Sequence, residues 1–82
     1  MFHKIKDVKP LDEFILEITF QDESIKYYDI KSVIDRWPSF NDLLTIAGLF
    51  SQVKVDNGGY GISWNDEIDL SCNELWENGY SK

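Results

Sequence analysis

Apolar and polar residues alternate along the N-terminal part of the chain. In the segment EFILEITF, residues 13–20, every second residue is apolar, which places these side chains on one face of a strand. The residues of that face are Phe14, Leu16, Ile18 and Phe20. After the polar turn at residues 21–23, the run SIKYYDI is interpreted as the returning strand of a hairpin. The preceding FHKIKDVKP predicts a first, weaker strand that ends at Pro10.

A helical period replaces the alternation from residue 31 onward. Apolar residues with helical spacing predict a helix that Pro38 stops; they are Ile30, Val33, Ile34 and Trp37. Ser39 is then the expected N-cap of a second helix, whose buried stripe lies within residues 40–47. Gly48 is expected to close this helix in a left-handed conformation.

The second half begins with two short predicted strands, residues 52–56 and 60–64. They are joined at Asn57-Gly58-Gly59, the strongest turn signal in the chain, because Asn and Gly accept positive φ at low cost. With the final helix described below, the order of elements is β-β-β-α-α-β-β-α. This order predicts an α+β fold, a single two-layer domain over residues 1–82 with a mostly antiparallel sheet of about five strands and helices packed on it.

The stretch LSCNELWENG carries the signals of a capped helix. Ser71 is the expected N-cap, and Glu74 is placed to reach back to the Ser71 amide in a capping box. Leu70 and Leu75 have the spacing of a hydrophobic staple, and Gly79 is expected to end the helix. These structural roles account for three of the most chemically suggestive residues of the stretch.

Composition narrows the classes of function. The 82 residues carry a net charge of −7, which disfavours direct binding to nucleic-acid phosphates or to an anionic membrane. Residues 41–82 alone hold seven acidic and two basic side chains, so the charge is concentrated in the C-terminal half. A single cysteine cannot form an internal disulfide, and no signal peptide or membrane span is recognisable. We therefore expect a cytoplasmic protein.

Chemical candidates near the last helix are few. Cys72 lies at a helix N-terminus, but the surrounding carboxylates disfavour a thiolate and no activating base is evident, so we expect it to be inert. The carboxylates of Asp66, Glu67 and Asp69 would serve a small-molecule or metal-sensing module, although they do not follow a calcium-loop pattern. No complete catalytic constellation and no cofactor site can be assembled, so an enzyme is the weakest hypothesis.

The leading hypothesis is an acidic face that binds another protein. Aromatic residues are enriched at protein interfaces, and several lie close to the carboxylates in sequence. The predicted interaction face comprises Tyr60, Trp64, Asp66, Glu67, Asp69 and Trp76. A basic protein partner would be steered toward this charge. Exposed sheet edges would also allow two copies of the chain to pair as a homo-oligomer.

The chain resembles a family of short bacterial proteins known as domain of unknown function 2442. The resemblance rests on IKDVKPLDEFILEITFQD, on YYDI, and above all on LFSQVKVDNGGYGISWNDEIDLSCNELWENG. It implies a compact α+β domain without assigned catalytic residues, here in the stand-alone form, and some relatives resemble members of toxin–antitoxin-like pairs. In the family the turn at Asp22-Glu23 usually reads Asp-Gly; because Glu tolerates positive φ poorly, we expect a longer turn or one of another type.

Overall fold

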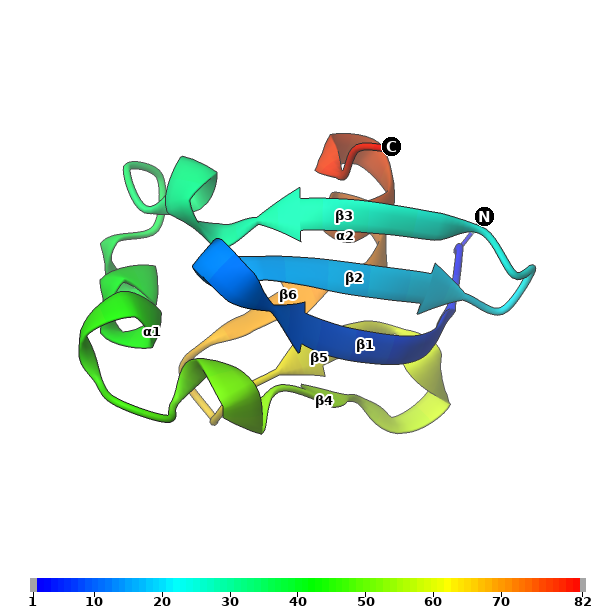
Figure 1. The fold of residues 1–82 in the computed structure, drawn as a ribbon. Helices are drawn as coiled ribbons and strands as arrows, with labels where there is room; N and C mark the ends of the chain where they lie inside the picture. The colour runs from blue at the N-terminus through cyan, green and yellow to red at the C-terminus, as the bar shows by residue number, and fades with distance from the viewer. Residues whose placement is uncertain (1, 82) are drawn as a thin grey trace.

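A computed structural model describes residues 2–81, which form six strands and two short α-helices with five 3-10 turns between them. The strands are β1 (Ile5–Leu11), β2 (Ile15–Phe20), β3 (Ile25–Asp29), β4 (Lys54–Val55), β5 (Gly61–Ser63) and β6 (Asp69–Ser71). The helices are α1 (Asp42–Thr45) and α2 (Cys72–Asn78). The α+β class is confirmed, but the expected single sheet is wrong: the strands form two antiparallel three-stranded sheets, ordered β1-β2-β3 and β4-β5-β6 (Figure 1).

The first sheet follows the alternation of its central strand. Along β2, Leu16, Ile18 and Phe20 are buried, and the residues between them are half-buried. The prediction that Pro10 ends the first strand is wrong, because Pro10 lies within β1 opposite Leu16. Proline is tolerated there because β1 is an edge strand, with one side of its backbone free of sheet hydrogen bonds.

The hairpin between β2 and β3 turns through a three-residue loop. The Glu23 N–H donates to the Phe20 carbonyl oxygen at 2.9 Å, and the Phe20 N–H donates to the Ser24 carbonyl oxygen at 2.8 Å. The loop is longer than a two-residue hairpin turn, as expected, yet Glu23 still adopts a left-handed φ of 74°. A three-residue hairpin loop requires a left-handed residue at this point, and here a glutamate takes the place usually given to glycine.

The middle of the chain departs most from expectation. The predicted helix at residues 30–37 is a 3-10 turn over Ile30–Val33, and the predicted helix at 40–47 is the 3-10 turn Pro38–Asn41 followed by the one-turn α1. The Ser39 side chain makes no cap hydrogen bond, whereas Gly48 has the expected positive φ, 83°. Each apolar run is too short to offset the unfavourable free energy of helix nucleation. Packing against the core therefore determines the backbone conformation of this segment.

The C-terminal half combines a predicted hairpin, an unpredicted strand and a predicted helix. Gly58 and Gly59 have positive φ at the turn between β4 and β5, as expected. Strand β6 was not predicted. Only Leu70 of its three residues is buried, and three residues are too few to show an alternation of apolar and polar positions. The α2 N-cap is confirmed, since the Glu74 N–H donates to the Ser71 hydroxyl oxygen at 3.1 Å.

The end of α2 uses glycine for space rather than for a left-handed φ. The prediction that Gly79 ends the helix is confirmed, since α2 ends at Asn78 and Gly79 is its C-cap, with an extended backbone of φ −73° and ψ 163°. Its N–H donates to the Leu75 carbonyl oxygen at 3.0 Å, and a Cβ at this position would lie only 2.5 Å from that oxygen. A larger residue would push the chain end away from the helix.

Both sheets and α2 enclose one core. In Figure 1 the second sheet lies beside β1, and α2 lies behind β3. The turn after β4 closes on β1, where a Cβ on Gly59 would lie 2.5 Å from the Ile5 carbonyl oxygen. The fully buried side chains include Leu16, Ile18, Phe20, Tyr28, Ile62, Ile68, Cys72 and Leu75. Within residues 2–81 no helix is long and apolar enough to cross a membrane.

Gly61 provides a direct test of how closely β5 and β6 approach. A Cβ on Gly61 would lie 2.6 Å from the Leu70 carbonyl oxygen, so Gly61→Ala must separate the two strands. We expect the free energy of unfolding to fall by about 1–3 kcal/mol, the usual cost of overpacking, measured by chemical denaturation. Gly48→Ala is the control for backbone strain alone, because a Cβ added there would meet no neighbouring atom within 4 Å. An unchanged stability of Gly61→Ala would contradict the close approach.

Candidate functional site

The predicted interaction face does not stay together in the structure. Asp66, Glu67 and Asp69 are exposed, and so is Tyr60, at 49%. Trp64 is only 5% exposed and its indole N–H donates to the Phe50 carbonyl oxygen at 3.0 Å, so it belongs to the core and is unavailable to a partner. The correction follows from the small size of the sheets, which need this ring to fill the space between them.

Tyr60 and Trp76 pack against N-terminal residues, and of the two only Tyr60 also borders a predicted carboxylate, because it lines a second, shallow pocket together with Asp69. The Tyr60 ring meets the Phe2 ring edge-on at 5.4 Å. The Trp76 ring stacks on the His3 ring at 3.6 Å, with the Lys26 ammonium 4.4 Å above it. These contacts occupy much of the Trp76 surface, which is half-buried.

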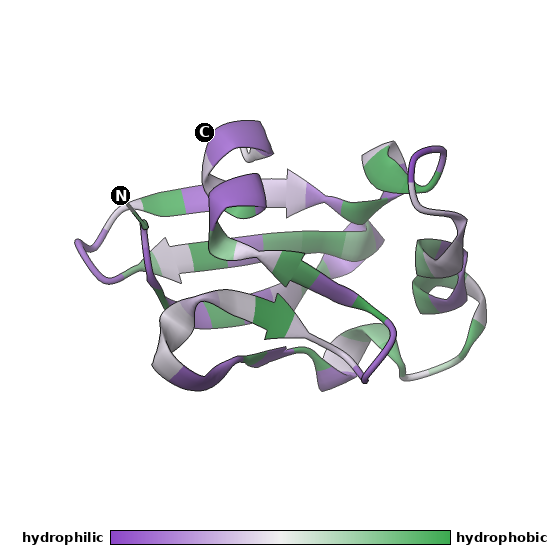
Figure 2. Ribbon diagram, turned by 180° about the vertical axis from the view of Figure 1, so that it is seen from behind, coloured by the Kyte–Doolittle hydropathy of each residue, from purple (hydrophilic) through white to green (hydrophobic). Residues whose placement is uncertain are grey.

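The three carboxylates belong to the loop between β5 and β6 and to β6 itself. The Asn65 side-chain oxygen accepts the N–H groups of Glu67 and Ile68, each at 2.9 Å, and thereby shapes the loop. Asn65, Asp66 and Glu67 are all exposed, and Figure 2 shows this connection in the purple of hydrophilic residues. The loop therefore presents charge to solvent while Ile68 returns the chain to the core.

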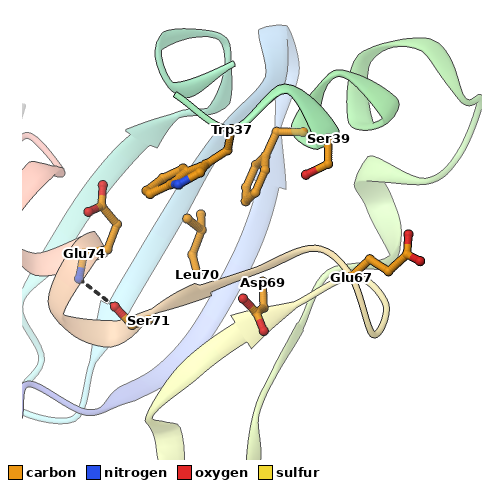
Figure 3. Close-up of a pocket in the computed structure, with 8 residues that line it drawn as sticks. Trp37, Ser39, Glu67, Asp69, Leu70, Ser71 and Glu74 are labelled. Carbon is orange, nitrogen blue, oxygen red and sulfur yellow. Dashed lines mark hydrogen bonds between the residues drawn. The ribbon is translucent and has the colours of Figure 1, made fainter. Parts of the chain in front are cut away.

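A groove lies between two of these carboxylates, Glu67 and Asp69, and an aromatic wall of Trp37 and Phe40, which the sequence pattern placed in two predicted helices. We call it the β6 groove; its volume is about 380 Å³. It is lined by Trp37, Ser39, Phe40, Glu67, Asp69, Leu70, Ser71 and Glu74 (Figure 3). Trp37 precedes Pro38, and its backbone (φ −131°, ψ 83°) is non-helical, because a proline disfavours the helical conformation in the residue before it. The dipeptide indicates a helix stop at Trp37, but no signal in the sequence places this residue beside the carboxylates.

The chemistry of the groove is divided between its two sides. Trp37 is 37% exposed and its ring centroid lies 5.7 Å from that of the buried Phe40. Across from them, Glu67 and Asp69 present exposed carboxylates. An occupant therefore meets an apolar surface on one side and negative charge on the other.

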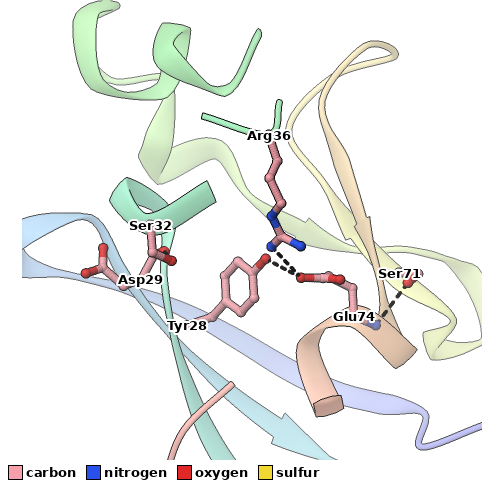
Figure 4. A network of polar contacts seen from close by, with 6 residues as sticks. All are labelled: Tyr28, Asp29, Ser32, Arg36, Ser71 and Glu74. Carbon is pink, nitrogen blue, oxygen red and sulfur yellow. Dashed lines mark hydrogen bonds and ion pairs between the residues drawn. The ribbon is translucent and has the colours of Figure 1, made fainter. Parts of the chain in front are cut away.

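At one end of the groove, Glu74 joins three elements. Its carboxylate accepts a hydrogen bond from the Tyr28 hydroxyl at 2.7 Å and pairs with the Arg36 guanidinium at 3.2 Å (Figure 4). The Arg36 guanidinium also lies 4.6 Å from the centre of the Trp37 ring. The expected capping box is wrong in its second half, because these partners draw the Glu74 carboxylate toward Tyr28 and Arg36.

Tyr28 titrates differently from an exposed tyrosine. Burial raises the pKa of its hydroxyl above the ordinary value, and the hydrogen bond to the Glu74 carboxylate raises it further. Both causes disfavour a phenolate next to a carboxylate in a poorly hydrated position. The neutral hydroxyl is thus kept as the donor that holds Glu74.

Other chemical candidates gain no support from their positions. Within residues 2–81, no group of three or more His, Cys, Asp or Glu side chains is placed to hold a metal ion. The Cys72 side chain is buried, at 1% exposure. Of the three predicted carboxylates, Glu67 and Asp69 line the β6 groove.

Comparison with known proteins gives one match. The model of a family described as "protein of unknown function (DUF2442)" matches residues 5–81, nearly the whole chain. No curated protein and no solved structure matches the chain significantly.

The bond between Tyr28 and Glu74 can be tested through its dependence on pH. We expect Tyr28→Phe to lower the free energy of unfolding at neutral pH by about 1.5 kcal/mol, the contribution of a hydrogen bond to a charged group. Because the folded-state pKa of Tyr28 is raised, its contribution is complete below the unfolded-state pKa near 10 and is lost as the pH rises above it. Denaturation between pH 7 and 11 measures both effects. Equal alkaline slopes for the two proteins would contradict this assignment.

Proposed function

The chain belongs to the DUF2442 family. We propose that it is a non-catalytic protein-interaction module that binds a basic protein partner at the β6 groove. The second small protein of a toxin–antitoxin-like pair is one kind of partner that fits this description. The observation that carries the proposal is the juxtaposition of an exposed aromatic ring, Trp37, with the carboxylates of Glu67 and Asp69 across one groove.

Each wall supplies a different part of recognition. Tryptophan is among the residues that contribute most affinity at protein interfaces, because a large apolar surface is removed from water there. The carboxylates at the rim contribute the rate of encounter and the choice of partner. A site with both features favours a protein surface that combines lysine or arginine with apolar side chains.

The charge of the whole molecule supports the same class of partner. The net charge of −7 extends the attraction to a basic protein beyond the contact distance, over roughly 10 Å at moderate salt. The same charge repels phosphate backbones. The negative charge of Glu67 and Asp69 thus adds to the electrostatic field of the whole molecule, which also attracts a basic protein.

Charge reversal at the groove tests the proposal. We expect the triple variant Asp66→Lys, Glu67→Lys, Asp69→Lys to weaken capture of the partner by about tenfold or more, and to reduce the dependence of capture on salt. The measurement is affinity capture by the tagged full chain from lysate of its source organism at low and moderate salt, followed by titration of the captured protein.

A second triple variant separates the site from the overall charge. Asp7→Lys, Asp12→Lys, Glu77→Lys changes the net charge equally, and these three exposed residues do not line the groove. It should retain most of the binding. If both variants lose the partner equally, only the net charge matters; if the groove variant binds as tightly as the original chain, the groove is not the site.

A further inference from the structure

We propose that the partner's segment binds in an extended conformation as an additional strand on the free edge of β6, with basic side chains facing Glu67 and Asp69. This inference rests on the proposed function and specifies how the groove is filled. It combines three features of the structure: the orientation of the β6 backbone, the groove next to it, and the contacts that Arg36 already makes there.

The hydrogen-bond pattern shows which way the β6 backbone points. The Trp64 N–H donates to the Ile68 carbonyl oxygen at 3.0 Å, and the Cys72 N–H donates to the Tyr60 carbonyl oxygen at 2.8 Å. In an antiparallel pair successive residues alternate between the two sides of the strand. The backbone groups of Asp69 and the N–H of Ser71 therefore point away from β5, toward the open edge of the sheet, whereas the Ser71 carbonyl begins α2.

The β6 groove lies along this open edge. Figure 3 shows Trp37 and Ser39 on one side of the β6 ribbon and the yellow β5 on the other. A strand added here pairs its backbone with Asp69 and Ser71, while its side chains alternate between the Trp37 wall and the carboxylates. Recognition through the backbone and through alternate side chains would then occur together.

Other strand edges among the described residues are less suitable. The edge of β3 is occupied by Tyr80, which exchanges hydrogen bonds with Tyr27 at 2.7 and 2.8 Å. The edge of β1 is approached by the backbone of the turn Asn57–Gly59. Strand β4 has two residues and does not border the β6 groove. Strand β6 therefore combines an open edge with the groove.

Arg36 shows which chemistry this end of the groove accepts. Its guanidinium pairs with the Glu74 carboxylate and lies 4.6 Å from the centre of the Trp37 ring, so a cation from the chain itself already contacts an aromatic ring and a carboxylate at this end. A second copy of the chain is a poorer occupant. Antiparallel pairing of two β6 edges would bring the Glu67 and Asp69 carboxylates of both copies together, and facing like charges destabilise a strand pair.

A labelled peptide and its N-methylated forms test strand addition. The probe is a fluorescein-labelled octapeptide of alternating lysine and valine, titrated with the full chain and followed by fluorescence anisotropy. Two analogues carry N-methyl groups on all valines or on all lysines, which block hydrogen bonding along one edge of the peptide each. Because only one edge pairs with β6, we expect the two analogues to differ in affinity by at least tenfold, and the unmodified peptide to slow hydrogen exchange of the Asp69 and Ser71 amides.

The outcomes separate this inference from the proposed function. Equal affinities of the two analogues, without slower exchange at Asp69 and Ser71, would mean that charge alone holds the peptide; strand addition is then wrong while the acidic interaction site stands. No binding of the unmodified peptide also overturns strand addition. The proposed function is decided separately by capture of the natural partner and its loss in the groove variant. Replacing all lysines of the probe with glutamate should abolish binding in every case.

Discussion

The two small sheets depend on each other for a core. Three strands with one apolar face cannot be stable alone in water, so Leu16, Ile18 and Phe20 of β2 must be covered by Ile62 and Leu70 of the second sheet and by Leu75 of α2. The close approach of Gly59 to Ile5 brings the turn after β4 against β1 and so holds the two sheets together. The positions of the loops and of the groove follow from this mutual coverage.

The shared core also decides which aromatic rings remain available for binding. Trp64 fills space between Phe40 and Phe50 and satisfies its indole N–H within the core. Trp37, whose backbone before Pro38 is non-helical, remains at the surface beside β6. The Glu74 carboxylate binds Tyr28 of the first sheet and Arg36, the residue next to Trp37. One carboxylate therefore helps to position the aromatic wall of the groove.

The sequence predicts elements whose signals are local and misses those decided by distant contacts. The β2–β3 hairpin, the turn at Gly58 and Gly59, and the Ser71 cap each depend on a few neighbouring residues. The 3-10 turns and β6 depend on what covers them, and the burial of Trp64 depends on Phe50, fourteen positions away. For the site, the exposed carboxylates were predicted, whereas the aromatic wall comes from a segment about thirty residues earlier that no pattern connects to them.

The acidity of the groove bears on the open edge of β6 as well as on a partner. An unpaired edge strand is a risk for self-association, and proteins reduce that risk with short strands and charged side chains. Strand β6 has three residues, two of them flanking Leu70 with exposed side chains, and Glu67 adds a second carboxylate at its start. In the proposed function, the charges that repel another copy would also attract a basic segment. One arrangement of carboxylates would then both protect the edge and select the partner.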